Sequence, residues 1–578
     1  MRTELSDRYK ILFIIFISLG VYYPSIFGQV NTVDDHMMIT NLLNTYHVDW
    51  KGIFFPGNPI YYYRPLLALT FLFDRFVFDC SASFMHLNNM LIHTANGVLI
   101  FFIVKELLRI FRIAADPYIP MLASIFFIIN PVNTEPVNWI SGRTDVLAGM
   151  FVFMSFLVFL KKGIENDLWC WISALLYLMG LLSKEVAIGL LPVIGLFLIL
   201  KERHIEDIVI ERRFRLFLPF LFMTAVYFLM RTIASGYIAD TGVETAARAV
   251  DNGSLLISIS GAIKAFGFYI KKLFIPLPLN FGIIEINRTL YFWFGIIASV
   301  VALYLFLRRR TLSSFLFLSS IPFFIVAIPV ALSKMAWTPL AERYLYISSF
   351  GVSVLIVLLI NRIPWKKELI YGALAILLIA SAAITVNRNI VWQSNLTLFS
   401  DTVKKSPNFA AARNDYGLTL LRNGKVKEAS EQFRIAKRLA GNVKYKEVPS
   451  MNIITLSMQR KPEEAKEEYL RLLEKKPTPQ LSVEILQKVI KITENQLMEE
   501  KNLDKQKRFY TEIISYLKQL YDIDRNGLYL YRTGQFYLAL GEKKRAIEYF
   551  KKAIELSPNE YFSNPARKLI KRLNETKN

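Results

Sequence analysis

The stretch that decides the fold is residues 86–108, HLNNMLIHTANGVLIFFIVKELL, which is long enough as a helix to cross the roughly 30 Å hydrocarbon core of a bilayer. Its polar residues recur at helical spacing, at His86, Asn89, His93 and Asn96. They share one helix face, and that face must meet protein or water because lipid cannot satisfy it. Hydrogen bonds between helices explain the stripe as well as a binding site does. The stretch therefore predicts a membrane helix inside a bundle.

Similar apolar runs lie on both sides of this stretch. They cover residues 11–29, 118–134, 144–160, 168–182, 186–200, 214–234, 291–307, 312–332, 343–361 and 367–386. A composition of 53% hydrophobic residues is also too apolar for a soluble multidomain chain. The net charge of +22 would suggest nucleic acid as the partner of a soluble protein, but here the basic residues lie largely in short loops. We expect an all-α polytopic bundle of about 11 spans and no nucleic-acid partner.

The basic loops also predict the orientation of the chain. Residues 255–275 are apolar but carry Lys264, Lys271 and Lys272, so we interpret them as an interfacial or re-entrant helix. With this choice, the basic clusters that lie on one side include Lys105/Arg109/Arg112, Lys161/Lys162, Arg212/Arg213/Arg215, Arg308/Arg309/Arg310 and Lys366/Lys367. We expect the N-terminus to be cytoplasmic and the C-terminus extracytoplasmic, in a plasma, inner or endoplasmic reticulum membrane.

From about residue 395 the sequence becomes charged and helix-favouring. Spacings typical of a tetratricopeptide helix pair occur at Gly534, Tyr537, Gly541, Ala546, Phe550, Ala553 and Pro558. The same spacings recur at Gly417, Gly424, Ala429, Phe433 and Ala436. The predicted organisation is a transmembrane domain at 1–390, with a first outer loop at 30–85, and a tetratricopeptide-repeat (TPR) α-solenoid at 395–578.

The first outer loop holds adjacent carboxylates. Asp34 and Asp35 lie in VDDHMMITNLLN, and adjacency raises the pKa of one relative to the other, which suits a general base. A helix cap is the alternative interpretation. The loop ends in YYYRPL, where Arg64 is suited to hold phosphate or to snorkel from an aromatic belt.

Further charged and aromatic residues collect in the other outer loops. The segment NPVNTEPVNWISGRTD (130–145) contributes Glu135, Trp139 and Arg143. A short turn contributes Lys184 and Glu185, and the last outer loop contributes Glu342 and Arg343. Each loop alone could be a salt-bridged connector, but loops of the same chemistry on one side of a membrane favour a shared cavity.

These segments together resemble the GT-C superfamily of polytopic glycosyltransferases, and specifically the TMTC type of O-mannosyltransferases with tetratricopeptide repeats. The resemblance rests on VDDHMMITN, YYYRPL, HLNNMLIHTANGVL, TEPVNWISGRTDVLAGMF, GLLSKEVAI and AERYLYISSFG, followed by the repeats. It implies inverting transfer of a sugar from a polyprenyl-phosphate carrier to a hydroxyl acceptor on the extracytoplasmic face. We expect this acceptor to be a protein that the repeats hold.

The resemblance also implies roles for individual residues. Asp34 would be the catalytic base and Asp35 would assist it or bind the acceptor. Arg343, Lys184, Arg143 and Arg64 would hold the donor phosphate. Glu135, His86, Asn89, Trp139, Glu185 and Glu342 are assigned to substrate binding. Asn130 and Asn133 stand where the family pattern leads us to expect His, which puts the choice of mannose in doubt, and a divalent cation stays open.

Two other functions are compatible with parts of the sequence. A noncatalytic membrane scaffold would use the repeats to recruit a partner and would not need Asp34. A transporter would place its substrate near the midplane, whereas the polar loops here cluster on one face and no inverted repeat is evident. A soluble nucleotide-sugar donor is disfavoured because no glycine-rich strand-to-helix motif is present.

Overall fold

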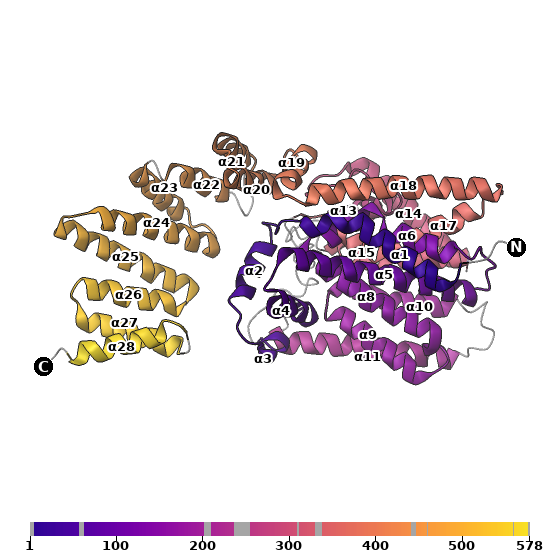
Figure 1. The fold of residues 1–578 in the computed structure, drawn as a ribbon, viewed down its shortest axis with the longest axis horizontal. Helices are drawn as coiled ribbons and strands as arrows, with labels where there is room; N and C mark the ends of the chain where they lie inside the picture. The colour runs from indigo at the N-terminus through magenta and orange to yellow at the C-terminus, as the bar shows by residue number, and fades with distance from the viewer. Residues whose placement is uncertain are drawn as a thin grey trace. The chain divides into compact units, whose positions relative to one another are not determined.

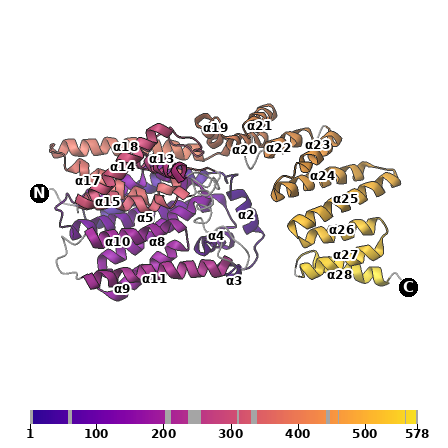
Figure 2. The same ribbon diagram turned by 180° about the vertical axis from the view of Figure 1, so that it is seen from behind.

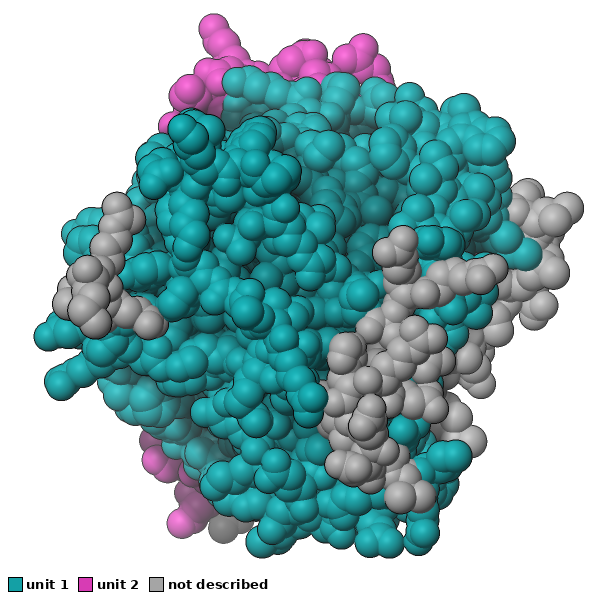
Figure 3. Space-filling model, turned by 90° about the vertical axis from the view of Figure 1, so that its right-hand side faces the viewer, with its two compact units in different colours: residues 1–409 teal, residues 410–578 magenta. Residues whose placement is uncertain are grey.

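The computed structural model describes residues 5–56, 63–200, 210–235, 255–308, 311–329, 338–440, 447–458, 461–558 and 560–575. It divides into two compact units, residues 1–409 and 410–578 (Figure 3). Tyr61 and Tyr62 of the YYYRPL motif lie outside the described residues. The helix at Asn395–Lys405, which the sequence interpretation put in the soluble segment, belongs to the first unit, where the side chain of Lys405 donates to the carbonyl of Leu279.

Unit 1 is built from helices (Figure 1). In chain order they are α1 (Asp7–Tyr22), η1 (Tyr23–Phe27), α2 (Asp35–Leu43), α3 (Trp50–Phe54), α4 (Pro65–Phe78), α5 (Ala82–Ile110), α6 (Ile119–Ile128), η2 (Pro131–Asn133), α7 (Thr134–Asn138), η3 (Ile140–Gly142), α8 (Arg143–Val158), η4 (Phe159–Gly163), α9 (Asp167–Leu181), η5 (Glu185–Gly189), α10 (Leu190–Leu200), α11 (Ile210–Ser235), α13 (Leu255–Phe274), α14 (Arg288–Arg308), α15 (Leu312–Ile325), η7 (Glu342–Leu345), α17 (Ser348–Asn361), α18 (Lys367–Trp392) and α19 (Asn395–Lys405). The only extended pairing among the described residues is an isolated bridge between Ile283 and Leu340.

The predicted membrane character is confirmed. Among the described residues, 6 helices are long and apolar enough to span a bilayer: Asp7–Phe27, Ala82–Ile110, Ile140–Gly163, Ile210–Ala234, Arg288–Leu307 and Lys367–Trp392. Shorter apolar helices coincide with the other predicted spans, at Ile119–Ile128, Asp167–Leu181, Glu185–Ile199, Leu312–Ile325 and Ser348–Asn361. The number of spans and their orientation stay predictions.

The interior of unit 1 is held by close helix contacts as well as apolar side chains. Helices α13 and α14 approach so closely that a Cβ on Gly267 would lie 2.1 Å from the carbonyl oxygen of Tyr291, and a Cβ on Gly295 2.1 Å from that of Ile263. Small residues allow such contacts between apolar helices, where van der Waals packing replaces the hydrophobic effect. This contact fixes α13, whose C-terminal end carries Lys272 toward Glu342 in the segment before α17.

The polar stripe of α5 faces protein. His93 and Asn96 are fully buried, and both hydrogen-bond the Tyr346 hydroxyl, at 2.7 Å from His93 Nδ1 and 2.8 Å from Asn96 Nδ2. Asn96 also donates to the carbonyl of Val146 at 2.9 Å. These bonds join α5 to α8 and to the loop before α17, so this half of the stripe fixes the helix bundle.

Unit 2 is a series of helices in which successive members pack side by side (Figure 2). They are α20 (Ala410–Arg422), α21 (Val426–Ala440), α22 (Val448–Ser457), α23 (Pro462–Glu474), α24 (Pro479–Glu499), α25 (Leu503–Asp524), α26 (Gly527–Ala539), α27 (Lys543–Leu556) and α28 (Ser563–Glu575). Gly534 lies against the ring of Phe550, as Gly417 lies against Phe433, because a larger side chain would collide there. The turn glycine Gly541 has φ +81°, a conformation that favours glycine. The all-α fold with tetratricopeptide repeats is thus confirmed.

Candidate active site

Asp34 ends the loop that leads from the first helix to α2. It occupies the N-cap position of α2, yet its side chain makes no capping hydrogen bond, so the cap interpretation does not account for it. The side chain is exposed, and no hydrogen bond or ion pair connects its carboxylate to another described residue. The surrounding protein raises the pKa of Asp34 by partial desolvation, while the charge of nearby Arg343 lowers it. Asp34 is thus a carboxylate of raised basicity that stays open to a ligand.

Asp35 has the opposite environment. It is fully buried, and its Oδ1 accepts from the backbone N–H and the hydroxyl of Ser141, at 2.9 and 2.5 Å, while Oδ2 accepts from the N–H of Asn31 at 3.3 Å. Burial raises the pKa of Asp35 to about 6, with these hydrogen bonds lowering it and the charge of Asp34 raising it. The side chain ties α2 to the η3 turn, which makes Asp35 a positioning residue for Asp34.

Arg343 and Glu135 form an ion pair, and the positive charge of Arg343 acts on the Asp34 carboxylate. Arg343 Nη1 lies 2.6 Å from Glu135 Oε1, and Oε2 accepts from the backbone N–H groups of Glu342 and Arg343 at 3.1 and 3.2 Å. Burial raises the pKa of Glu135, and the charge of Arg343 lowers it. The guanidinium also stacks at 5.1 Å over the rings of Trp139 and Tyr344. Glu135 therefore holds both the backbone and the side chain of Arg343 in place.

Lys184 is almost fully buried. Its ammonium lies 2.6 and 2.7 Å from the two oxygens of Asp145 and 5.3 Å from the ring centre of Tyr344. Burial lowers the pKa of Lys184, as do the positive charges of Arg64 and Arg343, whereas Asp145 raises it. Since Tyr344 contacts both Lys184 and Arg343, it lies between the two cations.

Arg64 and Glu185 form a third ion pair, and Arg231 of α11 also pairs with Glu185. Arg64 Nη2 lies 2.8 Å from Glu185 Oε2, and Arg231 Nη1 lies 3.7 Å from Glu185 Oε1. The hydroxyl of Tyr227 accepts from Arg231 at 3.2 Å. Arg64 and Arg231 retain 19% and 17% side-chain exposure, so both lie near the surface of the cluster.

Glu342 points away from this cluster and toward α13. Its Oε1 accepts from Lys272 at 2.6 Å and from the backbone N–H of Asn280 at 3.0 Å. Both side chains of the pair are almost fully buried. Glu342 thus anchors the loop that carries Arg343. Because its carboxylate is engaged by Lys272 and Asn280, the proposed function gives it no substrate contact.

Arg143 is buried and committed to protein groups. Its guanidinium donates to Asp74 Oδ2 at 2.5 Å, Asn89 Oδ1 at 2.8 Å and the carbonyl of Met85 at 2.9 Å. Asn89 in turn donates to the carbonyl of Trp139 at 2.8 Å. These contacts join α4, α5 and the 130–145 loop, so Arg143 and Asn89 support the loop instead of presenting donors to a phosphate.

The buried ring of His86 faces the backbone of Gly28, Gln29 and Asn138. Among the predicted site residues, Trp139 keeps its buried indole Nε1 without a hydrogen-bond partner among the described residues. Such orphaned groups are rare in native interiors and indicate a water or ligand partner. In contrast, the Asn130 side chain accepts from Val132 N–H, and Asn133 donates to the carbonyl of Phe127 at 2.8 Å, so these two asparagines stabilise the loop itself.

Asp74, Asp145, Tyr344, Arg231 and Lys272 complete these contacts but were not among the predicted site residues. Arg231 could have been found, since a charge on an apolar helix demands a partner. Metal binding gains no support: among the described residues, no group of three or more His, Cys, Asp or Glu side chains is placed to hold an ion. The arrangement thus offers an open Asp34 carboxylate on which the charge of Arg343 acts, and Arg343 is held in position by the buried Glu135.

Comparison with known proteins agrees with this architecture. The tetratricopeptide-repeat family model matches residues 527–560. The chain is 24% identical to human protein O-mannosyl-transferase TMTC3 over 421 residues, which is 64% of this chain and 44% of that protein. It is 25% identical to human protein O-mannosyl-transferase TMTC4 over 67% of this chain and 59% of that protein.

A protein O-mannosyl-transferase of Caenorhabditis elegans, F38B6.6, is 25% identical over 74% of this chain and 62% of its own length. The matches thus span about half the length of these curated relatives, from 44 to 62%. The resemblance predicted from the motifs is confirmed: the chain is similar to the TMTC-type protein O-mannosyl-transferases, at 24 to 25% identity.

Proposed function

We propose that the chain is a membrane glycosyltransferase that transfers a sugar from a polyprenyl-phosphate carrier to a hydroxyl group of a protein. The observation that carries this proposal is the exposed Asp34 carboxylate, which lies within the electrostatic influence of Arg343 and makes no hydrogen bond or ion pair to other described residues. The names of the relatives, all protein O-mannosyl-transferases, favour mannose and a protein acceptor.

In the proposed reaction the acceptor oxygen attacks the anomeric carbon from the face opposite the phosphate. The new C–O bond forms as the bond to the phosphate oxygen breaks, which inverts the configuration. The hydroxyl proton passes to Asp34, and the bonding electron pair leaves with the polyprenyl phosphate. The raised pKa of Asp34 makes its carboxylate a stronger base than an ordinary aspartate.

The leaving phosphate gains negative charge, so it needs fixed cations. Arg343 is best placed, because its charge acts on Asp34 and its side chain keeps 14% exposure. Arg64 and Arg231 are the next accessible cations, and Lys184 lies deeper. Glu135, Asp145 and Glu185 would hold these cations in position before the donor arrives, so the site would need little reorganisation.

Trp139 is the best supported substrate contact. Its indole N–H lacks a hydrogen-bond partner among the described residues and its ring supports Arg343, so it could donate to a sugar hydroxyl or to the phosphate. His86, whose buried ring faces the backbone of Gly28, Gln29 and Asn138, is proposed as a second contact. Asp35 and Arg143 are proposed as positioning residues, and the TPR unit as the surface that binds the acceptor protein on the extracytoplasmic side.

The decisive variant is Asp34→Asn. Membranes containing the full chain are incubated with radiolabelled polyprenyl-phosphate mannose, or its glucose counterpart, and label in proteins is counted. We expect Asp34→Asn to lower transfer by about 10²–10⁴-fold, the usual contribution of a general base. Asp79→Asn in the same loop is the matched control, because Asp79 is exposed at 80% and Asn tolerates its left-handed φ of 48°.

Full transfer by Asp34→Asn at normal membrane levels would refute the base assignment. Donor binding without any transfer in the wild-type chain would favour the membrane scaffold instead. Deletion of unit 2 tests the repeats separately: we expect protein labelling to fall more than donor binding, and a cytoplasmic C-terminus in a reporter fusion would refute the proposed placement of the repeats.

A further inference from the structure

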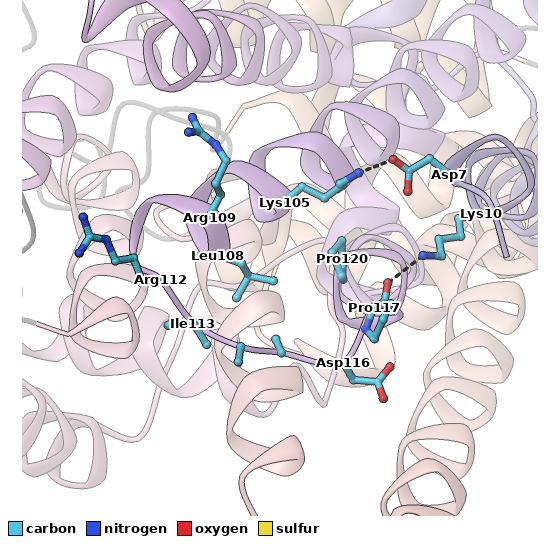
Figure 4. A pocket seen from close by; sticks show the side chains of 12 residues that line it. Asp7, Lys10, Lys105, Leu108, Arg109, Arg112, Ile113, Asp116, Pro117 and Pro120 are labelled. Atoms are coloured by element: carbon cyan, nitrogen blue, oxygen red, sulfur yellow. Dashed lines mark hydrogen bonds and ion pairs between the residues drawn. The ribbon is translucent and has the colours of Figure 1, made fainter. Parts of the chain in front are cut away.

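A cavity of about 370 Å³ lies at the opposite end of unit 1 from Asp34, between the start of α1 and the turn that joins α5 to α6 (Figure 4). Helix α5 separates the two sites: His86 lies near its first turn, and Leu108, which lines the cavity, lies in its last turn. At 1.5 Å per residue this is a separation of roughly 30 Å along the helix axis. We propose that this cavity binds the phosphate headgroup of an anionic lipid.

The charge of the cavity lining is the first support for this proposal. Its ionisable groups are the cations Lys10, Lys105, Arg109 and Arg112 and the acids Asp7 and Asp116. Cations therefore outnumber acids within one concave surface. A basic pocket at the end of a helical membrane bundle has the charge that a lipid phosphate requires.

The cations differ in how they are engaged. Lys105 pairs with Asp7, and Lys10 donates to the carbonyl of Pro117 at 3.1 Å, as Figure 4 shows. Arg109 pairs with Glu106 but keeps 61% side-chain exposure. The exposed guanidinium of Arg112 makes no ion pair or side-chain hydrogen bond to another described residue. Arg112 and Arg109 are therefore the groups best able to turn to a phosphate.

The neighbouring helix surface indicates a lipid instead of a free anion. On α1, Lys10 and Ile14 are buried, whereas Tyr9 and Phe16 are exposed at 61% and 71%. This helix is a candidate membrane span, so its exposed apolar face lies against acyl chains. A lipid with its phosphate in the cavity could extend its acyl chains along that face, which a soluble phosphate could not use.

The test is native mass spectrometry of the full chain in detergent with added dioleoyl phosphatidic acid, with dioleoyl phosphatidylcholine as the zwitterionic probe and glycerol 3-phosphate as the soluble one. The variant Arg109→Ser/Arg112→Asn removes the two cations best able to turn to a phosphate, and Asn suits the left-handed φ of 50° at position 112. Arg362→Ser/Lys366→Ser is the matched control, since it removes two exposed charges that do not line the cavity.

We expect phosphatidic acid to bind in preference to phosphatidylcholine, and its affinity to fall by about tenfold or more in Arg109→Ser/Arg112→Asn but not in the control, because charge-assisted hydrogen bonds are lost. The single variant Arg112→Asn, at an exposed position, should show part of the loss if the double variant cannot be purified. Equal binding of both lipids, or equal loss in both double variants, would overturn the proposal. Displacement of the lipid by equimolar glycerol 3-phosphate would overturn the lipid assignment.

Discussion

The most buried ion pairs of the membrane unit and the exposed ion pairs of the repeat unit differ in their access to water. Arg143 and Asp74 keep 1% and 0% side-chain exposure, and Lys272 and Glu342 keep 3% and 1%. In the repeats, Lys461 and Glu464 keep 61% and 65%. The buried pairs join residues far apart in the chain, whereas Lys461 and Glu464 lie three residues apart on one helix.

This difference separates two uses of charge. Removing a pair from water costs several kcal/mol per ion before attraction is counted, so a buried pair is seldom retained for stability alone. An exposed pair contributes roughly 0–1 kcal/mol and needs no explanation. The buried pairs of unit 1 include those that hold Arg343 and Lys184 in place, which supports a functional reason for the concentration of charge there.

Among the ion-paired residues, the largest expected effect is on catalysis, at Arg343. Arg343→Gln removes the charge beside Asp34 while its amide can still donate to Glu135. We expect sugar transfer to fall by about 10²–10³-fold, the usual cost of removing one fixed group that stabilises developing charge. Transfer from labelled polyprenyl-phosphate mannose measures this, with Arg362→Gln as the exposed control. Unchanged transfer would show that the buried charges of unit 1 serve architecture only.

Stability should respond most at Arg143. Arg143→Met leaves the Asp74 carboxylate buried without its cation, which is expected to cost about 3–5 kcal/mol of unfolding free energy. The double variant Arg143→Met/Asp74→Leu should recover much of this loss, because no uncompensated charge remains. Denaturant unfolding in detergent, followed by tryptophan fluorescence, measures both. If the double variant is as unstable as the single one, the pair stabilises the bundle directly.

The sequence was sufficient to predict the helical class, the membrane helices and the repeats, because these depend on local apolar runs and on spacings such as Gly534 to Phe550. It also predicted that the stripe on α5 would face protein or water instead of lipid. The candidate site residues could be identified from the sequence as charged and aromatic side chains in loops. Charged residues close to membrane-spanning segments are costly, so they stand out even without a structure.

The sequence could not predict which residues pair. Asp74 with Arg143, and Lys272 with Glu342, are separated by 69 and 70 positions, and their association depends on how helices pack. For the same reason Arg143 was predicted to bind phosphate, although its donors point to Asp74, Asn89 and Met85. The contrast between Asp34 and Asp35 also required the fold, because it arises from burial and from contacts of Asp35 with Ser141 and Asn31.

A smaller effect is expected from pH, through Asp35. Its pKa of about 6 in the fold exceeds the ordinary value of 3.8, so the folded chain holds the proton more tightly than the unfolded chain. The contribution of this group to stability is therefore fully present below pH 3.8 and is lost as pH rises through about 6. The difference in unfolding midpoint between the wild type and Asp35→Asn should change between pH 4.5 and 7, and a constant difference would contradict this assignment.

The smallest effect should come from the exposed pair Lys461–Glu464. Lys461→Ala removes a contact of 2.7 Å, but both side chains are well hydrated, so we expect the unfolding free energy of the repeats to change by less than about 0.5 kcal/mol. Phe550→Ala is the destabilising comparison in the same unit. This fully buried ring fills the space beside Gly534, and its loss should lower the unfolding free energy by about 3–5 kcal/mol. Both are measured by denaturant unfolding of the full chain, followed at the repeats by hydrogen exchange. If Lys461→Ala lowered the unfolding free energy by more than about 1 kcal/mol, solvent exposure would not separate the two kinds of ion pair. The functional interpretation of the buried charges in unit 1 would then lose its physical basis.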